Sequence, residues 1–208
     1  MSSALYKLSE FFIIFIGIPV AFTFSFNAWI KLSIGLIGFV YVVVVLLRTE
    51  KFKFKIAPDL NWKSFFKKTF LKLILIALIT YLFVFFNDKD ALFNVMTTKP
   101  KLWVIIFFVY SFFSVYPQEL IYRTFFFQRY KELISNKKLF IFINAIVFSL
   151  GHIFFRNTLV LLLTFFGGLL FAFTYSKTKS TLLVSIEHAI YGLWLFTVGM
   201  GDMLGFPS

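Results

Sequence analysis

Glu119 and Arg123 lie four residues apart inside a long apolar stretch of the sequence. Ionised groups inside a bilayer are costly, so they usually face a cavity or a partner and serve a function. The two histidines of the chain, His152 and His188, lie in two later apolar stretches. A glutamate, an arginine and two histidines on three hydrophobic segments are the residue types of an intramembrane active site.

Peptide hydrolysis is the chemistry that these residue types favour. A carboxylate beside a neutral imidazole can polarise a water molecule as a general base, and a second histidine or an amide can donate to the developing oxyanion. Arg123 would hold the Glu119 carboxylate ionised and oriented. A Zn²⁺ ion held by Glu119, His152 and His188 is an alternative, because three protein ligands leave one position for water. The sequence has no H-E-x-x-H spacing, so the spacing alone does not require a metal.

The composition predicts an all-α, polytopic membrane helical bundle. Hydrophobic residues make up 60% of the 208 residues, charged residues 14%, and the mean hydropathy is +0.89. Several apolar runs reach the roughly 18 residues that suggest a membrane-spanning helix, and they are continuous rather than alternating, which disfavours a β-barrel. We expect one transmembrane domain over 1–208 with about seven transmembrane helices, at about 11–26, 29–47, 70–86, 102–127, 139–155, 159–175 and 181–198. The absence of cysteine excludes disulfides, cysteine-based zinc sites and thiol catalysis.

The net charge of +12 indicates a membrane surface rather than nucleic acid as the partner, because the lysines lie mostly between the apolar segments. Outside the segments, 14 Lys and Arg residues lie on the side of the N-terminus and 5 on the other side. This asymmetry predicts a cytoplasmic N-terminus and, with seven spans, a C-terminus outside. We expect an integral membrane protein of the bacterial plasma membrane, surrounded by membrane lipid.

The candidate site residues are expected at related depths in the membrane. Glu119 and His152 each lie about 20 Å of helix rise from the loop between their segments. His188 lies only about 10 Å from its own loop, a difference that helix tilt or a later helix start could absorb. As an i, i+4 pair, Glu119 and Arg123 share a helix face, and Gln118 flanks it. The alternative reading of this pair is a buried ion pair that only fixes helix packing.

A fifth ionisable residue, Glu187, lies directly beside His188 but points about 100° away from it on a helix. We expect Glu187 to pair with a loop lysine such as Lys179.

Three short motifs resemble those of the CAAX protease and bacteriocin-processing (CPBP, or Abi) family of intramembrane proteases. The family motif E-E-x-x-x-R reads Gln118-Glu119-Leu120-Ile121-Tyr122-Arg123 here. The motif F-x-x-x-H reads Phe148-Ser149-Leu150-Gly151-His152, and the third motif, often H-x-x-x-N, reads His188-Ala189-Ile190-Tyr191-Gly192. The resemblance covers about 107–196 and implies a CPBP-like catalytic core there.

The resemblance implies a helical glutamate-type protease of a family that has also been described as metalloproteases, with Glu119, His152, His188 and Arg123 in its site. Relatives cleave near the C-terminus of prenylated proteins, process peptides or confer bacteriocin immunity. For this chain we expect a peptide or membrane-protein substrate, with prenylated proteins among the candidates.

Two residues depart from the family pattern. Gln118 occupies the place of the first glutamate, and a glutamine amide cannot act as a base. Gly192 occupies the place of the asparagine and removes an oxyanion donor. Either Glu119 works with His152 in an active endopeptidase, or the protein is a catalytically inactive membrane binding, scaffold or immunity protein. A small transporter that uses the same residues as a proton relay is a third hypothesis, although neither repeated halves nor interrupted segments support it.

Overall fold

The computed structural model describes residues 3–52 and 61–205. Within these residues every regular element is a helix, and seven helices are long and apolar enough to cross a membrane. These helices are Ala4–Ala21, Ala28–Thr49, Trp62–Asn87, Pro100–Arg129, Lys137–Phe155, Thr158–Thr178 and Thr181–Met200. The predicted all-α membrane fold with about seven spans is therefore confirmed. The observed helices extend beyond most of the predicted apolar cores because polar residues complete their end turns.

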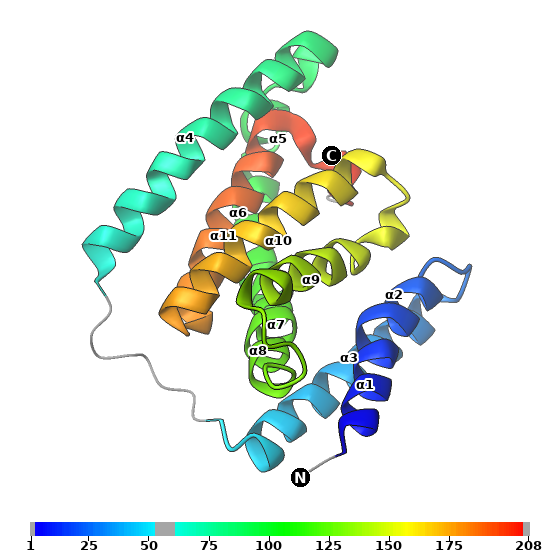
Figure 1. The fold of residues 1–208 in the computed structure, drawn as a ribbon. Coiled ribbons are helices and arrows are strands. Elements are labelled where there is room, and N and C mark those ends of the chain that lie inside the picture. Colours follow the sequence, from blue (N-terminus) through cyan, green and yellow to red (C-terminus); the bar gives the residue numbers. More distant parts are fainter. Residues whose placement is uncertain (1–2, 53–60, 206–208) are drawn as a thin grey trace. The chain divides into compact units, whose positions relative to one another are not determined.

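Figure 1 shows the elements in chain order. The first two spans contain α1 (Ala4–Phe12), η1 (Ile13–Gly17), α2 (Ile18–Ala21), α3 (Ala28–Val44) and η2 (Val45–Thr49). The third span is α4 (Trp62–Asn87), followed by the short η3 (Lys89–Ala91) and α5 (Asn94–Thr98). The fourth span contains α6 (Pro100–Val109), η4 (Tyr110–Val115), α7 (Tyr116–Glu119), η5 (Leu120–Phe125) and α8 (Phe126–Arg129). The last three spans contain α9 (Lys137–Leu150), η6 (Ile153–Phe155), α10 (Thr158–Thr178), α11 (Thr181–Leu195) and η7 (Phe196–Met200), and η8 (Asp202–Leu204) follows.

Asparagine caps fix the start of four spans. The side chains of Asn27, Asn61, Asn136 and Asn157 accept hydrogen bonds from backbone N–H groups in the first turns of α3, α4, α9 and α10. The first turn of a helix has N–H groups without intrahelical partners, and an asparagine side chain satisfies them well. The cap at Asn136 therefore sets where α9 begins and, through the helix, where His152 lies.

The fourth span is irregular around Glu119. Two π-helical segments, η4 and η5, enclose the four-residue α7, and Glu119 is the last residue of α7. Pro117 has no backbone N–H, so it cannot donate a regular helical hydrogen bond in α7. π-Segments inside transmembrane helices re-aim side chains and are frequent at functional sites.

The described residues form two compact units. The first contains residues 3–52 and 118–181, and the second contains 61–117 and 182–205. In the first unit α9 and α10 pack along their length, and Gly168 makes this possible because a Cβ at that position would lie 3.0 Å from the Cα of Ala145. In the second unit the indole N–H of Trp103 donates to Thr197 (2.9 Å), and that of Trp194 donates to Thr80 (2.9 Å). The single domain expected over 1–208 stays a prediction.

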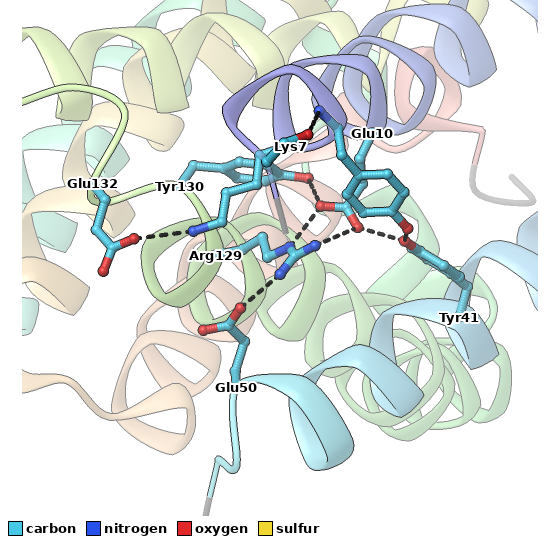
Figure 2. Close-up of polar contacts among 9 residues, drawn as sticks. Lys7, Glu10, Tyr41, Glu50, Arg129, Tyr130 and Glu132 are labelled. Carbon is cyan, nitrogen blue, oxygen red and sulfur yellow. Dashed lines mark hydrogen bonds and ion pairs between the residues drawn. The ribbon is translucent and has the colours of Figure 1, made fainter. Parts of the chain in front are cut away.

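A buried network around Glu10 ties three segments of the first unit together (Figure 2). Arg129 donates from Nε to Glu10 (2.7 Å) and from Nη1 to Glu50 (3.0 Å), and the hydroxyls of Tyr130 and Tyr41 also donate to Glu10. Glu10 is 6% exposed and Arg129 only 3%. Burial and then the charge of Glu10 raise the pKa of Tyr130 above its ordinary value, so this phenol stays protonated and donates. The network thus connects α1, the end of η2 and the end of α8.

Removing Arg129 should destabilise the first unit strongly, because Glu10 would keep its buried charge without its main counter-charge. We expect Arg129→Gln to lower the free energy of unfolding by about 3–5 kcal/mol, the usual cost of breaking a buried ion pair. The measurement is unfolding of the full chain in mixed micelles. The matched control is Glu132→Gln, which removes a 3.1 Å ion pair with Lys7 from a side chain that is 68% exposed. This control should unfold like the wild type. Equal stability of both variants would show that the network around Glu10 does not hold the unit together.

Candidate active site

The centre of the first unit is the ion pair between Glu119 and Arg123. Arg123 Nε lies 3.3 Å from Glu119 Oε2, and both side chains have no solvent exposure. The expected pairing of the two residues across one helical turn is therefore present, although η5 makes the turn π-helical. The guanidinium also lies over the ring of Phe148, 4.5 Å from its centroid, where the negative face of the ring favours a cation.

Asn144 of α9 completes this centre, and the sequence analysis did not identify it. Its Oδ1 accepts a hydrogen bond from Arg123 Nη1 (2.8 Å), and its Nδ2 donates to the backbone carbonyl of Tyr122 (2.6 Å). The side chain is completely buried. A single amide in the apolar run of α9 was the available signal, because buried polar groups need partners. Asn144 fixes the guanidinium and thereby the direction from which it meets Glu119.

His152 lies just after the end of α9, with its backbone outside the helical region (φ −108°, ψ 6°). Its Nδ1 lies 2.8 Å from the backbone carbonyl oxygen of Phe148. A carbonyl can only accept, so Nδ1 carries the proton and, in the neutral ring, the lone pair is on Nε2. This is the tautomer that a general base or a metal ligand needs.

Phe148 connects the two polar groups of the first unit. Its ring centroid lies 4.9 Å from that of His152, and the same ring carries the Arg123 guanidinium. The phenylalanine of the F-x-x-x-H motif therefore contacts both the histidine of the motif and Arg123. The similar depth that the helix rise predicts for Glu119 and His152 stays a prediction.

Gly151, directly before His152, is required by a close approach of Tyr122. A Cβ at this position would lie 2.2 Å from the Tyr122 hydroxyl oxygen. The Tyr122 ring in turn packs edge-on against Phe148, with centroids 5.3 Å apart. The Tyr122 hydroxyl thus occupies the space that a side chain at position 151 would fill.

The second unit has a similar arrangement at His188 of α11. The side chain is 7% exposed, and its ring lies perpendicular to that of Tyr110 with centroids 6.1 Å apart. One turn later, a Cβ at Gly192 would lie 2.0 Å from the Tyr110 hydroxyl oxygen. This contact explains why glycine stands at 192, because Tyr110 leaves no room for an asparagine. The sequence analysis did not identify Tyr110, and no pattern in the sequence pointed to it.

The expected partner of Glu187 was wrong. Its carboxylate binds Lys72 of α4 (2.6 Å) and accepts from the Tyr191 hydroxyl (3.0 Å), so the partner is a lysine inside a span and not the loop residue Lys179. Glu187 is completely buried, whereas the Lys72 side chain is 30% exposed. Burial explains the difference, because a buried carboxylate needs a partner at its own depth. Glu187 therefore connects α11 to α4 within the second unit.

The first unit thus brings together Glu119, Arg123 and His152, with the half-buried Gln118 preceding Glu119 in α7. His188 lies in the second unit, and its approach to the other three stays a prediction. Within 3–52 and 61–205 no three His, Asp or Glu side chains form a group that could hold a metal ion. Zinc binding by Glu119, His152 and His188 accordingly stays a prediction too.

Comparison with known proteins identifies one family. Residues 100–194 match the model described as "Type II CAAX prenyl endopeptidase Rce1-like", and this range contains Glu119, Arg123 and both histidines. No curated protein and no solved structure gives a significant match. The resemblance that the three motifs indicated is thereby confirmed at the level of this family model, which residues 100–194 match.

Proposed function

We propose that this chain is an intramembrane endopeptidase in which Glu119 and His152 activate a water molecule. The observation that carries the proposal is the buried centre of the first unit, where Glu119 is paired with Arg123 and His152 is held in the tautomer with a basic Nε2. The family match over the same residues supports a protease. A carboxylate held in place and an imidazole whose lone pair is on Nε2 are the groups that general-base catalysis uses.

In the proposed reaction Glu119 and His152 orient the water, and one of them accepts its proton. The resulting hydroxide forms a bond to the carbonyl carbon of the peptide, and the carbonyl π-bond becomes the oxyanion. The accepted proton then moves to the peptide nitrogen, the C–N bond breaks, and a carboxylic acid and an amine are released. Arg123 and Asn144 contact neither product and act as positioning residues for Glu119.

The substrate class proposed here is a peptide or membrane protein, with prenylated proteins favoured by the family description. The proposed orientation places the N-terminus in the cytoplasm of a bacterial cell. If the protein uses Zn²⁺, then Glu119, His152 and His188 are the residues that would hold it, and the ion would supply a more acidic bound water. The proton transfers proposed above use the side chains of this chain alone.

Replacing either proposed base should abolish cleavage. We expect Glu119→Gln and His152→Gln each to lower kcat by at least about 10²-fold, because general-base catalysis contributes that much or more. The measurement is cleavage of a membrane-peptide library that includes prenylated peptides, by purified protein in nanodiscs, with and without chelator.

Glu132→Gln serves as the control with an exposed carboxylate, and unfolding midpoints show whether each variant is folded. Glu119→Gln leaves Arg123 without its counter-charge, so the double variant Glu119→Gln/Arg123→Gln tests the same base with both charges removed. Wild-type turnover by folded variants would refute the proposed role of these residues. Loss of wild-type activity with chelator would indicate the metal route.

The inactive binding or immunity protein is the second candidate function, and Gln118 is the observation that favours it. If the lack of a carboxylate at position 118 makes the protein catalytically inactive, the Gln118→Glu variant should cleave peptides that the wild type does not cleave. If Glu119 and His152 suffice, the wild type should cleave, and Gln118→Glu should alter the rate without being required. The same peptide library decides between the two, because it compares both proteins on identical substrates.

A further inference from the structure

A basic cavity of about 490 Å³ lies in the first unit, away from the candidate active site. Three lysines line it, namely Lys131 after α8, Lys137 at the first position of α9 and Lys179 just after α10. The volume falls within the roughly 300–1,000 Å³ that is usual for small-molecule sites. All three lysines belong to loops on the side of the chain that is richer in positive charge.

The three lysines of this basic cavity outnumber the carboxylates near them. No Asp or Glu is among the residues that line it. Glu132, the neighbour of Lys131 in the chain, interacts with the charge of Lys131 but is bound to Lys7 at 3.1 Å. Desolvation and then the charges of Lys137 and Lys131 lower the pKa of Lys179 below its ordinary value. The three ammonium groups therefore repel one another, and a bound anion would relieve that repulsion.

The rest of the lining is amphipathic. The hydroxyl of Ser135 and the amide of Gln128 can donate hydrogen bonds to an anion. On the apolar side, the rings of Phe127 and Phe140 lie 5.0 Å apart, and Lys179 Nζ lies 5.5 Å from the Phe127 ring centroid. Several cations beside an aromatic wall, at the end of membrane-spanning helices, suit a ligand with a charged head and an apolar body.

We propose that the basic cavity binds the phosphate group of an anionic phospholipid. The lysines would contact the phosphate oxygens, and the Phe127–Phe140 wall would contact the glycerol and the first carbons of the acyl chains. The proposal does not depend on protease activity. A free phosphate ion offers the same oxygens, but it lacks the apolar part that this wall would cover.

The test uses the full chain in phosphatidylcholine nanodiscs with increasing amounts of phosphatidylglycerol, and native mass spectrometry counts the retained anionic lipid. Lys131→Gln/Lys137→Gln/Lys179→Gln should weaken retention of one phosphatidylglycerol by at least about tenfold, because it removes several charge-assisted hydrogen bonds. The matched control is Lys63→Gln/Lys67→Gln/Lys68→Gln, which removes three exposed charges at the start of α4 and should retain the lipid. The wild type should show no such retention of phosphatidylcholine.

Equal losses in the two triple variants would overturn the proposal, because the lipid would then follow overall charge and not the basic cavity. Displacement of phosphatidylglycerol from the wild type by excess inorganic phosphate would assign the cavity to free phosphate and would also overturn it. Unfolding midpoints of both variants in phosphatidylcholine alone control for misfolding. Should the cavity variant not fold, Lys179→Gln alone, compared with Lys68→Gln, provides the same comparison with one charge.

Discussion

A buried charge in a membrane protein must have a counter-charge at its own depth, and this constraint organises the structure. Three completely or nearly completely buried carboxylates illustrate it: Glu10 binds Arg129, Glu119 binds Arg123 and Glu187 binds Lys72. In an apolar medium, breaking such a pair leaves a charge that nothing else compensates. The Glu10–Arg129 and Glu187–Lys72 pairs therefore fix the register of the segments that carry them, whereas lipid-facing leucines and phenylalanines can slide past one another at little cost.

The pairs differ in what surrounds them, and the difference separates packing from chemistry. Glu10 and Glu187 receive tyrosine hydroxyls in addition to their cations, and both connect segments distant in sequence. The Glu119 pair lies within one helical turn, so it connects nothing by itself. Its neighbours instead orient it. Asn144 accepts a hydrogen bond from the guanidinium, which also lies over the ring of Phe148. The same ring packs against His152. This pair joins no distant segments, yet Asn144 and Phe148 both hold its guanidinium, and the proposed chemical role rests on that observation.

The sequence was sufficient for the spans and for the pairing of Glu119 with Arg123. Long apolar runs determine membrane helices almost by themselves, and an i, i+4 Glu–Arg pair can meet on nearly any helical backbone. The sequence analysis did not identify Asn144, Tyr110 or the Lys72–Glu187 pair. The contacts of these residues depend on which helices become neighbours. The expected partner of Glu187 was wrong for this reason, since counting along the chain favoured a nearby loop and not a lysine of α4. The π-segments η4 and η5 also escaped prediction, because apolar periodicity does not distinguish an i+4 from an i+5 hydrogen bond over one turn.

The glutamine at 118 has a physical reason in the same constraint. With Gln118, the centre of the first unit contains one negative charge, on Glu119, and one positive charge, on Arg123. A second carboxylate at 118 would add a negative charge next to Glu119 in the chain. The balanced centre costs less to bury, but an amide cannot accept a proton. In the proposed mechanism proton transfer falls to Glu119 or to His152, and the hydrogen bond from His152 Nδ1 to the Phe148 carbonyl puts the lone pair of the neutral ring on Nε2.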